Sequence, residues 1–147
     1  MEKSRKNLKT YSFLVLLFGA VSLIKAILEI CFVKIDMSQL PEGTTEETVL
    51  IAKIVILVLS VIVLLPQFYV GFKGLRIAKN PTASRTHIKW AIVLLVITAL
   101  ALVSPIVEIV KGNHIGLSVS TLCDLVLEGT IYFEYIRYAR SVAKEIS

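Results

Sequence analysis

Four apolar runs, each long enough to cross a lipid bilayer, most constrain what this chain can fold into. They occupy residues 11–33, 48–72, 88–110 and 115–136. An α-helix rises ~1.5 Å per residue, so about twenty residues cross the ~30 Å hydrocarbon core of a bilayer. Hydrophobic residues make up 56% of the sequence, which is far from the balance of a soluble domain of this length. We therefore predict an all-α integral membrane four-helix bundle, made of two helical hairpins that form one membrane domain over residues 1–147.

The polar segments between the runs carry signals for helix ends. A proline and a glycine interrupt residues 34–47, which hold several acids in place of branched apolar side chains, so this segment is predicted to be an exposed loop. Thr44 or Thr45 can cap the helix that follows, with two glutamates near its positive end. Near the other end of that helix, Gly71 and Gly74 allow either a close approach of another helix or a bend.

Lys and Arg residues are distributed unevenly around the apolar runs. Four lie in the N-terminal segment, five around the Asn80–Pro81 turn and three in the C-terminal tail. The two loops on the opposite side hold only Lys34 and Lys111. Because cytoplasmic loops carry the excess of Lys and Arg, we place both termini in the cytoplasm. The basic segments are interpreted as topology determinants, with binding of anionic lipid headgroups as the alternative.

The last run carries two carboxyl groups where a membrane helix normally excludes them. Asp124 and Glu128 are four residues apart, so they share one helical face near the middle of the run. A charged residue at the centre of a span costs roughly 2.5 to 3.5 kcal/mol on insertion scales. Asp124 and Glu128 therefore require partners, a water-filled cavity or a proton.

Four further charged residues lie within the runs, closer to the ends opposite the basic segments. Glu29 and Glu108 are expected close to that interface, where both can reach water. Lys25 and Lys53 lie about 5 to 10 Å below it, within reach of a flexible stem, and are candidate counter-ions for the carboxylates. The four acids outnumber the two lysines, which favours attraction of cations over anions.

Two functional interpretations of these six residues stay open. In the first, they form an intramembrane acidic site that binds a small cation, a proton or a cationic ligand, as in a small cation- or proton-linked transporter or a ligand-binding component. In the second, the same side chains specify helix packing in a structural or accessory subunit of a larger membrane complex, or in a homo-oligomer. Polar contacts between membrane helices contribute about 0.6 kcal/mol on average, so a packing role is modest but ordinary.

Motifs for catalysis, metal binding and cofactor binding are absent from the sequence. There is no GxGxxG, P-loop, HExxH or GxSxG pattern, and Cys31 and Cys123 have no CxxC spacing. His87 and His114 are single histidines without a second ligand at i+4, so positioning at the membrane interface is favoured over metal binding. We therefore predict a non-enzymatic protein without a cofactor. We also predict no nucleic-acid partner, because the net charge of +5 is explained by membrane topology.

The segment Gly71–Pro81, GFKGLRIAKNP, is followed by another apolar run. This pattern resembles one in uncharacterised small multi-span membrane proteins of Gram-positive bacteria. The resemblance covers only part of the chain and rests on a short motif. It implies a multi-pass protein of the bacterial cytoplasmic membrane, and it carries over no activity and no site residue.

Overall fold

The computed structural model describes residues 2–32, 38, 41–82, 84–113 and 115–146, and over these residues the fold is all-helical, as predicted. The helices are α1 (Glu2–Phe32), α2 (Glu46–Lys79), α3 (Thr86–Ala101), α4 (Val103–Val110) and α5 (Ile115–Ile146). α3 and α4 follow each other almost directly and form one apolar stretch, Thr86–Val110. Within the described residues, four helical stretches are therefore long and apolar enough to cross a membrane.

The helices extend beyond the apolar runs into the basic segments that flank them. α1 begins at Glu2 and α5 continues to Ile146, because Lys and Arg are good helix formers that do not end a helix. At its other end α2 is capped by Thr45, whose side chain accepts a hydrogen bond from the Thr48 amide at 3.2 Å. Thr45, one of the two predicted caps, is thereby confirmed. Thr44 instead donates its hydroxyl to the backbone of the preceding turn.

Pro105 accounts for the break between α3 and α4. A proline has no backbone N–H, so Pro105 cannot donate to the carbonyl of Ala101, which is the last residue of α3. The chain tightens there, and the Leu102 amide donates to the Ala99 carbonyl at 3.3 Å. α2, in contrast, continues through Pro66.

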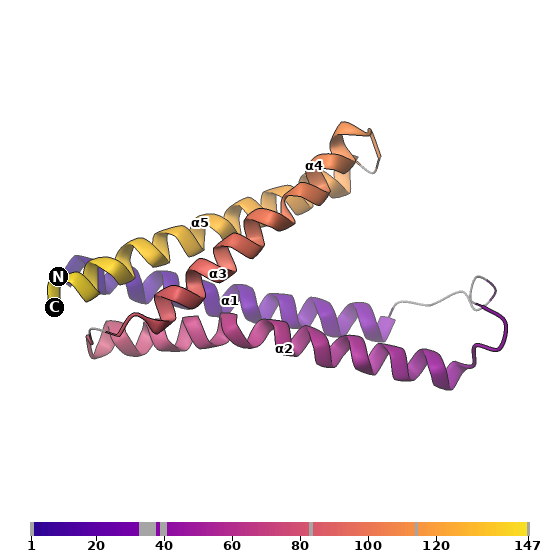
Figure 1. Ribbon diagram of the computed structural model, residues 1–147, viewed down its shortest axis with the longest axis horizontal. Helices are drawn as coiled ribbons and strands as arrows, with labels where there is room; N and C mark the ends of the chain where they lie inside the picture. The colour runs from indigo at the N-terminus through magenta and orange to yellow at the C-terminus, as the bar shows by residue number, and fades with distance from the viewer. Residues whose placement is uncertain (1, 33–37, 39–40, 83, 114, 147) are drawn as a thin grey trace.

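The helices form two antiparallel pairs that diverge like the arms of a V (Figure 1). α1 and α2 make the first pair, and α5 with α3 and α4 makes the second. The start of α1, the end of α2, the start of α3 and the end of α5 lie together at one end, which we call the terminal end (Figure 1). At that end α1 also packs on α5 and α2 packs on α3, so this is the vertex of the V. The opposite end, where the pairs lie far apart, is the distal end.

The core occupies the vertex and contains many small side chains. In α1 the buried residues stop at Gly19, and in α2 they start at Gln67, so the distal halves of these helices contribute none. Between membrane helices, where lipid tails are as apolar as leucine, small residues allow the close backbone approach on which packing depends. The small residues buried toward the vertex are Ser12 and Gly19 of α1, Gly71, Gly74 and Ala78 of α2, Ala91 of α3, and Ala139 and Ala143 of α5.

Gly71 and Gly74 bring α2 close to α1 and α5. A Cβ atom at Gly71 would lie 2.5 Å from Cγ of Leu16, and one at Gly74 would lie 2.6 Å from Cε2 of Tyr135. Both distances are shorter than ordinary contacts between carbon atoms, which are about 3.5 to 4.0 Å. Of the two roles predicted for these glycines, close helix approach is confirmed.

Candidate functional site

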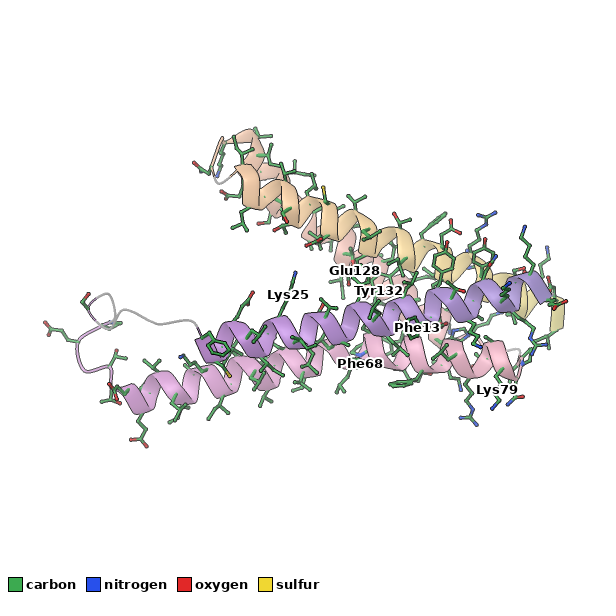
Figure 2. The ribbon with its side chains drawn as sticks, turned by 180° about the vertical axis from the view of Figure 1, so that it is seen from behind. Phe13, Lys25, Phe68, Lys79, Glu128 and Tyr132 are labelled. Carbon is green, nitrogen blue, oxygen red and sulfur yellow. The ribbon has the colours of Figure 1, made fainter. Side chains whose placement is uncertain are left out.

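An ion pair between Lys25 and Asp124 joins the two helix pairs on the distal side of the vertex. Nζ of Lys25, on α1, lies 3.9 Å from Oδ2 of Asp124, on α5. Figure 2 shows Lys25 pointing away from α1 toward the second pair. The two side chains are 65% and 62% exposed, so the ion pair lies in the opening of the V and not within the packed core.

Glu128 lies one helical turn nearer to the vertex than Asp124 and has a different partner. The hydroxyl of Tyr132 donates to Oε1 of Glu128 at 3.0 Å. Tyr132 is fully buried and Glu128 is half-buried, and both are found where α5 approaches α1 (Figure 2). Within the described residues no lysine or arginine pairs with Glu128. The carboxyl group is therefore held in place by a neutral donor at the floor of the opening.

The other three predicted site residues lie on different helices or faces. Glu29 is exposed one turn beyond Lys25 on α1, and Glu108 is half-buried on α4. In the described part of the chain neither of these glutamates forms an ion pair. Lys53 is half-buried on α2. The structure thus brings together Lys25 and Asp124 with Glu128 close by, and membership of the other three stays a prediction.

An open groove with a volume of about 400 Å³ lies between α1 and α2 beside this site. Ser22 and Ala26 of α1 and Ser60 of α2 contribute to its otherwise aliphatic wall. Ser22 precedes Lys25 by one helical turn, and the Ser60 hydroxyl donates to the Ile56 carbonyl at 2.8 Å. The space between α1 and α2 therefore has a few polar atoms, close to Lys25 along α1.

A buried polar network at the vertex was not predicted from the sequence. The hydroxyl of Tyr135 donates to the Val70 carbonyl at 2.9 Å and lies 2.7 Å from Nδ1 of His87. Nε2 of His87 lies 3.2 Å from the Ser84 carbonyl. His87 was expected only to position the chain at the membrane interface, and it is fully buried instead. Tyr135 is 48 residues from His87 and 65 residues from Val70 in sequence, so no local sequence pattern predicts the network.

Metal binding and known relatives give no further indication of function. Among residues 2–32, 38, 41–82, 84–113 and 115–146, no group of three or more His, Cys, Asp or Glu side chains could hold a metal ion. No family model, curated protein or solved structure matches the chain. Function therefore has to be inferred from the site itself, and the resemblance to Gram-positive membrane proteins stays a prediction.

Proposed function

We propose that the protein is a bacterial cytoplasmic membrane protein, a four-helix bundle of two hairpins with both termini in the cytoplasm. The support is electrostatic. The three basic segments, with twelve Lys and Arg residues between them, belong to the helix ends that meet at the terminal end (Figure 1). By the positive-inside rule this end is cytoplasmic. The V then opens toward the outside.

We propose further that the opening of the V binds a small cation, a proton or a small cationic ligand at Asp124 and Glu128. The observation that carries this proposal is the exposed ion pair between Lys25 and Asp124. In this pair the protein places its own ammonium group beside the carboxylate that a ligand cation would use. Charged groups inside membrane proteins face a water-filled cavity or one another. Lys25 and Asp124 face each other, and in this proposal the opening around them is filled with water.

Lys25 acts in this proposal as an exchangeable counter-ion. Charge-assisted hydrogen bonds are about 2.7 to 2.9 Å long, so a separation of 3.9 Å leaves the ammonium group loosely held. A cation bound to Asp124, or a proton on it, removes the attraction for Lys25. Because this pair bridges α1 and α5, ligand occupancy is coupled to the separation of the two helix pairs.

A structural or accessory subunit is the second candidate, and the shape of the molecule favours it. Toward the distal end the two pairs diverge, and the exposed charges of Lys25 and Asp124 lie in the space between them. A helix of another protein, or of a second copy, could fill the opening and supply the hydrogen bonds that water supplies in the first proposal.

Removal of both carboxylates separates the two candidates. We expect that Na⁺, K⁺ or spermidine raises the melting temperature of the purified wild-type protein, because a ligand selective for the folded state stabilises it by about 2.7 kcal/mol at one hundred times its Kd. The double variant Asp124→Asn with Glu128→Gln should lose this stabilisation. The matched control, Glu42→Gln with Glu47→Gln, removes two acids from the exposed distal loop and first turn of α2 and should keep it.

Two results would contradict the binding site. In one, the cation stabilises the double variant as much as the wild type, which would place the ligand elsewhere. In the other, none of the cations stabilises the wild type, while the double variant no longer copurifies with a membrane partner or forms its normal oligomer. That second result would support the structural role.

A further inference from the structure

A separate cavity at the terminal end combines cationic and apolar side chains. It has a volume of about 380 Å³ and lies between the first turns of α3 and the last turns of α5, more than four helical turns along α5 from Asp124. Its lining consists of Arg85, Ile88, Lys89, Ile92, Arg140 and Lys144. Four cations and two isoleucines thus surround one space, and no acidic side chain lines it.

Three of these cations are not used by the fold. In the part of the chain that the structure describes, no carboxylate pairs with Arg85, Lys89 or Arg140. Two other basic residues of the terminal end have structural partners. Arg5 donates to the carbonyls at the end of α2, at 3.0 and 2.8 Å, and Arg137 pairs with a glutamate one turn away at 3.5 Å. Arg85, Lys89 and Arg140 are therefore available to an external anion that enters the cavity.

The backbone at the start of α3 adds to the positive character of the cavity. Arg85 is the N-cap residue of α3, and its side chain makes no capping hydrogen bond. The first amides of a helix have no intrahelical acceptor, and the helix dipole places partial positive charge there. Across the cavity Arg140 and Lys144 share one face of α5, whereas the acid Glu145 accepts from Ser141 on the next face.

The apolar part of the lining points to the kind of anion. Ile88 is buried and Ile92 is half-buried, and their i, i+4 spacing forms a strip along α3 that leads from the basic rim into the apolar stretch. A free phosphate would use the cations and leave this strip unused. An anionic headgroup with an acyl chain attached matches both halves.

We propose that this cavity binds an anionic phospholipid, with its phosphate among Arg85, Lys89, Arg140 and Lys144 and an acyl chain along Ile88 and Ile92. The recognised chemistry is a phosphate ester, and arginine is well suited to it because its guanidinium group can form two parallel hydrogen bonds. The site lies where the proposed topology puts the headgroups of the cytoplasmic leaflet, and its function is independent of Asp124 and Glu128.

A tryptophan placed beside the cavity provides the measurement. Trp90, the single tryptophan of the chain, lines a different groove, against Pro66 and Tyr69 of α2, so it is replaced by phenylalanine. Phe133 is exposed in the groove between α3 and α5, two turns from Arg140 on the same face of α5, and Phe133→Trp puts the reporter there. This reporter background serves as the wild type of the experiment. The protein is reconstituted in phosphatidylcholine bilayers, and part of the lipid is replaced by phosphatidylglycerol or phosphatidylcholine with brominated acyl chains, which quench tryptophan fluorescence on contact. Stronger quenching by the brominated phosphatidylglycerol gives its relative binding constant. We expect the wild type to prefer phosphatidylglycerol.

Two matched double variants test whether the preference for phosphatidylglycerol depends on the cavity. Arg85→Gln with Arg140→Gln removes two guanidinium groups that hold the phosphate directly in this proposal, so the preference should fall by about fivefold or more. Lys6→Gln with Lys9→Gln removes the same charge from exposed positions of α1 outside the cavity and should leave the preference close to that of the wild type.

Three outcomes would overturn the proposal. The first is a wild type that shows no preference for phosphatidylglycerol. The second is an equal loss in both double variants, which would reduce the effect to general surface charge. The third is reversal of the selective quenching by inorganic phosphate or glycerol phosphate at millimolar concentration, because the cavity would then take the free anion without needing the acyl chain.

Discussion

A single hydroxyl group at the vertex connects three helices. Tyr135 of α5 donates to the Val70 carbonyl of α2, and it contacts His87 at the start of α3 both through its hydroxyl and through the edge of its ring. Val70 and Ser84 contribute carbonyl oxygens, which only accept. A neutral His87 has one N–H donor and Tyr135 has one O–H donor, so two donor protons serve three contacts. A positively charged His87 has two N–H donors, which raises the number of donor protons to three. The network is thus fully bonded only when the Tyr135 proton is shared or His87 is charged.

Loss of the Tyr135 hydroxyl should weaken the vertex. Tyr135→Phe removes the bond to Val70 and leaves Nδ1 of His87 buried without its partner, so we expect a loss of about 1 kcal/mol in unfolding free energy. Unfolding of the detergent-solubilised protein by SDS titration measures this. The control is Tyr138→Phe, where the ring stacks on Tyr11 and, within the described residues, the hydroxyl makes no hydrogen bond. Equal stabilities of the two variants would contradict a structural role for the network.

At the scale of helices, α2 is the element on which both pairs depend. It packs on α1 along much of its length and on α3 near its C-terminal end. Near that end, the absence of a side chain at Gly74 leaves room for the Tyr135 ring of α5. Gln67 donates to the Val15 carbonyl of α1 at 3.2 Å, which adds a polar link in a core of small residues. At the C-terminus of α2, Arg5 satisfies the Ala78 and Lys79 carbonyls that the helix itself cannot use.

A single added methyl group should disrupt this approach. At Gly74 an alanine Cβ would lie 2.6 Å from Cε2 and 2.7 Å from the hydroxyl of Tyr135, and it would also collide with Oγ of Ser12. Overpacking of this kind costs about 1 to 3 kcal/mol, and SDS unfolding should show Gly74→Ala destabilised by that amount. At Gly129, on α5, an alanine Cβ would meet its nearest atom at 3.7 Å. Gly129→Ala should be neutral or slightly stabilising, because alanine favours the helix.

At the scale of the whole molecule, the V shape separates a packed half from an open half. The packed contacts between the two pairs lie at the terminal end. Toward the distal end, the helices of each pair pack mainly on each other. The Lys25–Asp124 ion pair bridges the region where the pairs have already separated. Changes in the opening angle of the V therefore disturb few packed contacts, and regions with few buried contacts are the ones expected to move.

The two native cysteines allow this opening to be measured. Cys31 on α1 and Cys123 on α5 are exposed, one on each pair. Spin labels on them report the distance between the pairs by pulsed electron resonance. Lys25→Met removes the bridging charge, so we expect a longer or broader distance distribution than in the wild type. The control Lys111→Met changes a lysine in the distal turn after α4 and should leave the distribution unchanged. An unchanged distribution in Lys25→Met would show that the ion pair does not restrain the opening.

The sequence by itself determined the four apolar stretches and limited the cap of α2 to Thr44 or Thr45, because these features depend on the length of apolar runs and on neighbouring residues. It also made Asp124 and Glu128 the leading candidates for a site, since a carboxyl group within a membrane span carries a high energetic cost. Only the tertiary structure decided that Asp124 faces Lys25, that Glu128 is held by Tyr132 and that His87 is buried against Tyr135. The physical reason is that helices apolar on nearly every side have no amphipathic stripe to mark the face that packs. Their crossing and their contacts follow from where small residues let backbones approach, and that becomes visible only when the helices are placed together.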